Sequence, residues 1–279
     1  MSRATTVRPF FTLPLAALLA SLLAAGPAPA QDLQGAIRTQ LAAADSVPVD
    51  QLFALGNRLL DAAPDNDDAF RNALLQAVDG ASERTRLAAA VALKGLKEDD
   101  TFGRDLLALI APLATSADEQ VRGKALALLG DSQAFNSRVL PDVQKILVEN
   151  CQDELVPPAA RIEAALALWA VGSNSQRGIA KSTLELFLRS SDRDLEVRGA
   201  LALAQINVES GKAWSVLRDI KDEPTDFGRQ AQLFLQRAEM RREFDRDLAN
   251  LAQRLQGAGN EPARGETDEY RMLDELRDR

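Results

Sequence analysis

The chain has 279 residues, of which 46% are hydrophobic and 5% aromatic, and its formal net charge is −8. An acidic balance argues against nucleic acid or an anionic membrane as the partner, because both bind clustered positive charge. Histidine is absent from the sequence, which excludes Ser-His-Asp and Cys-His catalysis and histidine-liganded zinc. The sequence also contains no Gly-rich phosphate loop and no paired-cysteine metal motif, so we expect no cofactor and no metal.

Residues 1–30 have the three parts of a secretory signal peptide. Arg3 and Arg8 make the positive first part, Phe10–Ala25 is an apolar run of 16 residues, and Ala28-Pro29-Ala30 is a small-residue cleavage site. A membrane-spanning anchor is the alternative, but spanning a bilayer takes about 20 apolar residues. We therefore expect cleavage after residue 30.

Cleavage would make the protein periplasmic or secreted, with no membrane contact in the mature form. Removal of Arg3 and Arg8 lowers the number of basic residues from 33 to 31 and leaves the 41 acidic residues unchanged. The net charge of the mature chain is then −10.

The first part of the mature chain predicts two helices, over about 33–44 and 49–62. Leu52, Leu55 and Leu59 have helical spacing, but neither segment contains the motif that recurs further on. Terminal repeats of a solenoid are atypical because one of their faces meets water.

The most regular stretch of the sequence runs from Asp118 to Gly130. Its apolar residues recur with the period of an α-helix: Val121, Ala125, Leu128 and Leu129. Asp118 stands where a helix N-cap belongs, and Gly130 stands where a helix can end in a left-handed residue. We expect one capped helix here.

This helix returns along the chain. Its arginine has counterparts 36, 39, 37 and 31 residues apart, which is the period of two-helix repeats: Arg86, Arg122, Arg161, Arg198 and Arg229. Each copy follows a leading helix, which predicts pairs at 67–79 with 82–96, 103–116 with 118–130, 138–151 with 158–171, 177–190 with 194–207, and 212–221 with 225–241. The expected fold class is all-α, an α-solenoid of stacked helix pairs over residues 31–256.

The motif Asp-x-x-Val-Arg-x-x-Ala resembles the second helix of a HEAT-like repeat, the type also found in phycobilin lyases. The resemblance covers roughly residues 66–240. It implies that the Asp and Arg are framework residues that hydrogen-bond between neighbouring repeats. This role falls on Asp118, Arg122, Asp194 and Arg198, and more loosely on Arg86 and Arg161, whose Asp position holds Ser82 and Pro157. A tetratricopeptide repeat fits less well, because its Trp/Leu-Gly/Tyr pattern is missing.

The last repeat helix is expected to continue past residue 241. Phe244, Leu248, Leu251 and Leu255 follow at 4-3-4 spacing, as in a coiled-coil seam. Two interpretations remain open: a long helix that caps the last repeat, or a coiled coil through which two copies dimerise. Residues 257–279 combine a Gly-rich flexible linker with a highly charged tail.

Three single residues have both a functional and a structural interpretation. Cys151 is the one cysteine and is either a reactive thiol or, as its apolar spacing favours, a core residue. Trp169 and Trp214 either line a binding groove or fill gaps between unequal repeats.

The sequence favours an exported, non-catalytic protein–protein interaction scaffold, because stacked helix pairs offer an extended binding surface. Its expected partner surface follows the repeat helices at Lys124, Glu163 and Asn207. The alternative is a regulatory or accessory N-terminal part of a secreted hydrolase, or a HEAT-type lyase.

Overall fold

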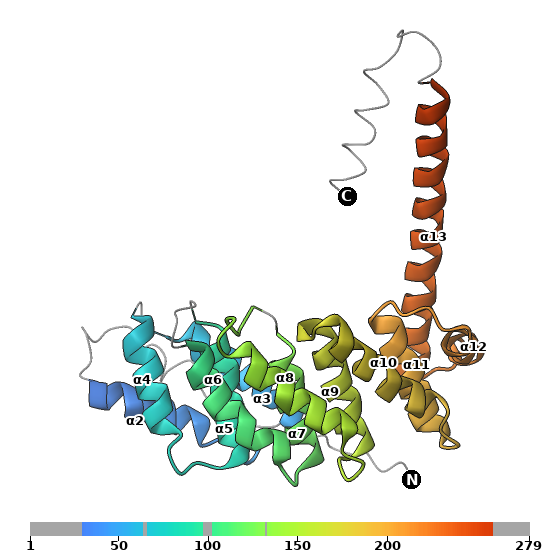
Figure 1. Ribbon diagram of the computed structural model, residues 1–279. Helices are drawn as coiled ribbons and strands as arrows, with labels where there is room; N and C mark the ends of the chain where they lie inside the picture. The colour runs from blue at the N-terminus through green and yellow to red at the C-terminus, as the bar shows by residue number, and fades with distance from the viewer. Residues whose placement is uncertain (1–29, 64–65, 97–101, 132, 259–279) are drawn as a thin grey trace, which may run out of the picture. The chain divides into compact units, whose positions relative to one another are not determined.

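The computed structural model describes residues 30–63, 66–96, 102–131 and 133–258 (Figure 1). Over these ranges every regular element is a helix and none is a strand, which confirms the predicted all-α class. None of these helices is both long and apolar enough to cross a membrane. Of the expected signal peptide and of the expected linker and charged tail, residues 1–29 and 259–279 lie outside the described residues, while Ala30 begins a helix and residues 257–258 end one.

Twelve α-helices and one short 3-10 helix occupy the described ranges, close to the positions that the periodicity predicts. In chain order they are α2 (Ala30–Leu41), α3 (Val49–Asp61), α4 (Asp67–Ala77), α5 (Glu83–Lys94), α6 (Phe102–Ile110), η1 (Ala111–Thr115), α7 (Glu119–Leu129), α8 (Leu140–Gln152), α9 (Pro158–Val171), α10 (Asn174–Leu188), α11 (Arg193–Gln205), α12 (Gly211–Ile220) and α13 (Asp226–Ala258).

The helices belong to two compact units, and the division falls within α10. The first unit runs to Leu184 and the second begins at Glu185. Each unit is described by itself below.

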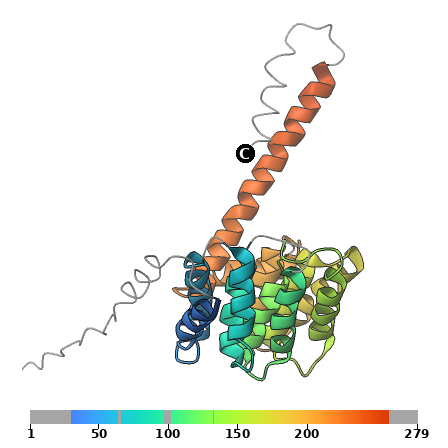
Figure 2. The same cartoon turned by 90° about the vertical axis from the view of Figure 1, so that its left-hand side faces the viewer.

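In the first unit, the second helix of each pair packs against the second helix of the next. The contacts run from α3 to α5, from α5 to α7 and from α7 to α9, while α4, α6 and α8 each pack on the helix that follows them. Figures 1 and 2 show these helices side by side. Because α5 has neighbours on both sides, it is buried from Leu87 to Leu93 without a break.

The N-terminal pair α2/α3 joins this packing although it lacks the repeat motif. Gly56 of α3 lies so close to α5 that a Cβ on it would stand 2.5 Å from the Ala88 carbonyl oxygen and 2.6 Å from Val91 Cβ. Only glycine allows this approach of the two backbones. The pair is therefore an integral part of the first unit.

Gly130 ends α7 for a different reason from the predicted one. Its φ is −77°, so it is right-handed and not left-handed. A Cβ on Gly130 would lie 2.8 Å from Ala167 Cα of α9. The close packing of α7 and α9, and not helix termination, requires glycine at this position.

The predicted helix over 103–116 is broken. The α-helix α6 ends at Ile110 and continues as the 3-10 helix η1, which has Pro112 in its first turn. Proline has no N–H for the bond to the carbonyl four residues earlier, and its ring crowds that carbonyl. The sequence interpretation overlooked this interruption.

In the second unit, α11 and α12 pack on the first part of α13, at its Asp226 end (Figure 1). This contact is what the capping interpretation requires. Beyond it, residues 239–247 of α13 are all exposed, and Met240 and Phe244 are 60% and 40% exposed. An exposed apolar pair of this kind is what the coiled-coil interpretation requires. Leu251 is buried.

The contact at Gly56 can be tested by replacing glycine with alanine. Gly56→Ala should lower the free energy of unfolding by about 1–3 kcal/mol, because α3 and α5 must move apart. Gly178→Ala is the matched control, since Gly178 also lies inside a helix but has no atom within 4 Å of a new Cβ. There alanine should stabilise by up to about 1 kcal/mol through helix propensity. Equal effects in denaturant titrations would contradict the close approach.

Candidate functional site

Arg122 links two successive helix pairs. Its Nε and Nη2 atoms donate to Asn150 Oδ1 of α8 at 3.1 and 2.7 Å. Asn150 is only 4% exposed, and its Nδ2 donates to the Ile146 carbonyl at 2.9 Å. The bond joins α7 to the leading helix of the next pair, as the HEAT-like resemblance implies for this arginine.

Asp118 acts at the start of α7. Its Oδ1 accepts from the backbone N–H groups of Gln120 and Val121, which makes it the N-cap. Its other carboxylate oxygen lies 4.0 Å from Arg84 Nε, so Asp118 also faces the preceding second helix, α5.

Further polar contacts join the starts of neighbouring second helices, and the sequence interpretation did not identify them. Ser82, the N-cap of α5, donates to Asp45 Oδ1 at 2.5 Å. Ser116, which precedes α7, donates to Glu83 Oε2 at 2.5 Å. Arg84 donates to the Asp45 carbonyl at 3.3 Å. Ser82 thus replaces the Asp of the motif both as cap and as a link to the preceding pair.

The other expected framework residues make more local contacts. Arg161 donates to the Cys151 carbonyl at the end of α8, at 3.2 and 3.3 Å. Arg86 is half-buried, and its side chain has no hydrogen bond or ion pair with another described residue.

Asp194 and Arg198 pair with each other at 2.7 Å within α11. Arg198 also lies 5.4 Å from the ring centroid of Phe227 in α13. The N-cap of α11 is Asp192, two residues before the expected position. Asp194 therefore occupies a different place on its helix from Asp118.

The three expected partner-surface residues are divided between the two units. Lys124 of α7 makes an ion pair with Asp50 of α3 at 3.0 Å and lies 5.7 Å from the Phe53 ring centroid. Glu163 of α9 is half-buried, and its Cγ is 3.7 Å from the position of a Cβ on Gly123. These two residues therefore lie on neighbouring second helices of the first unit.

Asn207 lies in the second unit, just past the end of α11. Its φ is 55°, its N–H donates to the Ala204 carbonyl, and the next N–H, that of Val208, donates to the Leu203 carbonyl. These bonds are a Schellman motif, in which asparagine is one of the few residues that accept the left-handed position. Helix termination accounts for Asn207, and its side chain also borders a groove.

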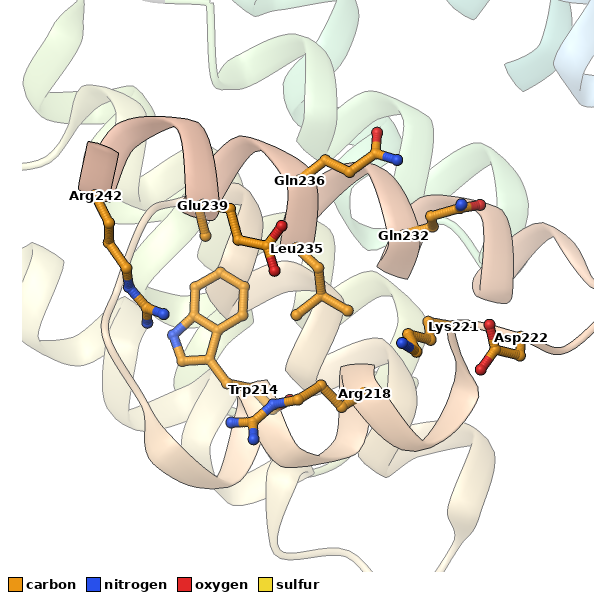
Figure 3. Close-up of a pocket in the computed structure, with 10 residues that line it drawn as sticks. Trp214, Arg218, Lys221, Asp222, Gln232, Leu235, Gln236, Glu239 and Arg242 are labelled. Carbon is orange, nitrogen blue, oxygen red and sulfur yellow. The ribbon is translucent and has the colours of Figure 1, made fainter. Parts of the chain in front are cut away.

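Two grooves flank Trp214 in the second unit. The larger has a volume of about 460 Å³ and lies between α12 and α13 (Figure 3). The smaller, about 320 Å³, borders Asn207 at the end of α11. Trp214, Ala238 and Arg242 line both. This pair of grooves, named here the Trp214 groove, is our candidate site.

The Trp214 indole has an unsatisfied hydrogen-bond donor. Nε1 is buried and has no hydrogen-bond partner among the described residues. The ring lies under α13, and its nitrogen faces the Arg242 guanidinium (Figure 3). Buried donors normally have an acceptor, so this one marks a place where an acceptor could bind.

The groove has more basic side chains than acidic ones, in contrast to the chain as a whole. Its basic residues are Arg218, Lys221, Arg237, Arg241 and Arg242, and its acidic ones are Glu209, Asp222, Glu239 and Asp245. Arg218 Nε is held by the Trp214 carbonyl at 3.2 Å. The four other cations make no ion pair with a described residue. The groove can thus offer several donors to an anionic group.

The sequence left two interpretations open for Trp214, a groove residue or a gap-filling residue. It gave no weight to the arginines of α13. The available signal was their density, because Arg237, Arg241, Arg242 and Arg246 fall within ten residues of an otherwise acidic chain. Their proximity to Trp214 depends on how α12 packs on α13.

Cys151 is a core residue. It is 1% exposed, and burial raises the pKa of its thiol to about 12, although Arg161 and Thr183 act in the opposite direction. A thiol with this pKa is almost entirely protonated at neutral pH and is a poor nucleophile.

Comparison with models of known protein families, with curated proteins and with solved structures finds no match to this chain.

Arg122→Ala should lower the free energy of unfolding by about 1–3 kcal/mol, because Asn150 Oδ1 is left buried without its donor. Arg229→Ala is the control: the same residue type in the fifth copy of the motif, 70% exposed and paired, within the described part of the chain, with the 78% exposed Asp226. Its effect should stay within about 0.5 kcal/mol. Denaturation followed by circular dichroism measures both, and an equal, small effect would remove Arg122 from the framework.

The Cys151 thiol should make stability fall with pH in the alkaline range. Its pKa is near 9 when unfolded and about 12 when folded, so the unfolded chain releases the proton first and gains free energy from doing so. Between these values stability should fall by at most about 1.4 kcal/mol for each pH unit. Cys151→Ala should lack this component, while both proteins should have the same pH dependence from pH 7 to 8. Parallel curves above pH 9 would contradict the raised pKa.

Proposed function

We propose that this protein is an exported, non-catalytic protein–protein interaction module whose helix pairs form a HEAT-like α-solenoid. The row of contacts from α3 to α9 supports the repeat architecture, since each second helix packs on the next. The bond between Arg122 and Asn150 supports it further, because it joins consecutive pairs at the position that the resemblance implies.

The observation that carries the binding role is the Trp214 groove. It combines an aromatic ring with a buried indole donor and several arginines that, among the described residues, have neither an acceptor nor an ion-pair partner. Tryptophan and arginine are the residue types that contribute most to protein–protein binding energy. The groove lies on α12 and α13, so binding in this proposal centres on the second unit.

The groove chemistry also favours binding over catalysis. A hydrolytic or acyl-transfer site needs a nucleophile, a base and a group that orients the base. The groove supplies arginine, lysine and indole donors, which attract an anionic surface. Its four carboxylates have no hydroxyl, thiol or histidine beside them among the described residues of the lining. The chain contributes no histidine, and its one thiol is buried in the first unit and is not part of the groove lining.

The test is affinity capture from an envelope extract of the source organism with the immobilised chain. Arg242→Glu reverses a charge that lines both grooves, whereas Arg229→Glu makes the same change on the same helix outside them. At least one partner should be retained by wild-type protein and by Arg229→Glu, and reduced about tenfold or more by Arg242→Glu, which corresponds to about 1.4 kcal/mol.

Circular dichroism must show that both variants remain folded. If every captured protein binds the two variants equally, the groove is not the interface. A turnover that Arg242→Glu abolishes would replace the interaction proposal with an enzymatic one.

A further inference from the structure

Two hydrogen-bond donors face each other in the Trp214 groove. One is the buried indole Nε1, which has no acceptor among the described residues. The other is the Arg242 guanidinium, toward which the indole nitrogen points (Figure 3). Neither donor can satisfy the other, so an acceptor placed between them would bond to both.

A carboxylate is the acceptor that fits this pair best. It has two oxygens, so one can accept from the indole while the other accepts from the guanidinium, and bonds between charged groups are the stronger ones. A peptide carbonyl could satisfy the indole but would leave the arginine charge without a counter-ion. Arg242 is exposed, so its side chain can move to admit the ligand to the buried nitrogen.

The rest of the lining favours a carboxylate that belongs to a peptide. Leu235 and Ala238 give the larger groove apolar surface, and Phe234 does the same for the smaller. A small free anion would leave this surface uncovered. Asp222 and Glu239 line the larger groove and would repel a doubly charged phosphate more than a single carboxylate.

We infer that the Trp214 groove binds a short segment of a partner protein in which an aspartate or glutamate stands beside an apolar side chain. The carboxylate lies between Trp214 Nε1 and Arg242, and the apolar side chain packs on Leu235. Arg218 and Lys221 add positive charge along the larger groove. This inference rests on the proposed interaction function and specifies the chemistry of its partner.

The two tryptophans make a direct test possible by NMR, because the chain has two indole N–H groups. The Trp169→Phe variant assigns the two signals, and Trp169 then serves as the internal reference. The probes are soluble octapeptides with a central Glu-Leu, Gln-Leu or Lys-Leu pair in a Gly/Ser background, together with inorganic phosphate and acetate.

The Glu-Leu peptide should shift the Trp214 signal in a saturable way and leave the Trp169 signal unchanged. The Gln-Leu peptide should bind at least about tenfold more weakly, since it lacks the charged acceptor. Arg242→Gln should weaken Glu-Leu binding by a similar factor, and Arg229→Gln should not. Trp214→Phe, which keeps a ring but removes the donor, should weaken binding measured by calorimetry.

Equal binding of the Glu-Leu, Gln-Leu and Lys-Leu peptides would overturn the inference, and so would an unshifted Trp214 signal. Acetate or phosphate binding as tightly as the peptide would show a small-anion site instead. The peptide titration and the affinity capture can give different answers. If Arg242→Glu loses a captured partner but no peptide shifts the Trp214 signal, the groove still binds a partner, and the inference that the partner segment is acidic is wrong.

Discussion

The close approach of neighbouring second helices is the constraint on which the first unit depends. At Gly56 against Ala88 and Val91, and at Gly130 against Ala167, the backbones come so near that a single added carbon has no room. Such close contact increases both the dispersion attraction between the helices and the apolar surface removed from water. Larger side chains at these points would force the helices apart. This explains why alanine and leucine fill the core and why the chain uses so few aromatic residues.

Apolar contact alone leaves the backbone N–H groups at helix starts without hydrogen-bond acceptors, and polar side chains supply those acceptors. Ser82 and Asp118 cap α5 and α7 and also reach the preceding pair. Arg122, further along α7, also links neighbouring pairs. Its side chain is half-buried, and its acceptor, Asn150, is almost fully buried. Such bonds are costly to break because the partner stays in a place that water reaches poorly. The exposed pair of Asp194 and Arg198 has no such penalty, so an equivalent sequence motif contributes less there.

The sequence determined the helices far better than the site. Periodicity located every described helix, because each has to bury one apolar face and that requirement is local. It missed the break at Pro112, and it misjudged Gly130, whose role depends on Ala167, 37 residues further on. Lys124, expected on a partner surface, forms an ion pair with Asp50 of an N-terminal helix that lacks the motif, a contact that no local pattern predicts. The Trp214 groove depends on side chains that α12 and α13 bring together, and no local pattern encodes that meeting.

The unsatisfied indole connects binding to stability. In the unfolded chain Trp214 Nε1 bonds to water, whereas in the folded protein it has no partner among the described residues, a difference that costs about 1–3 kcal/mol. A ligand that supplies the acceptor recovers this free energy only in the folded state, so part of its affinity comes from a penalty that folding has already incurred. Arg237, Arg241 and Arg242 make no ion pair with a described residue, so their charges are available to a carboxylate supplied by a ligand. In the proposed function, a ligand that binds only the folded protein and supplies this acceptor therefore also stabilises the fold.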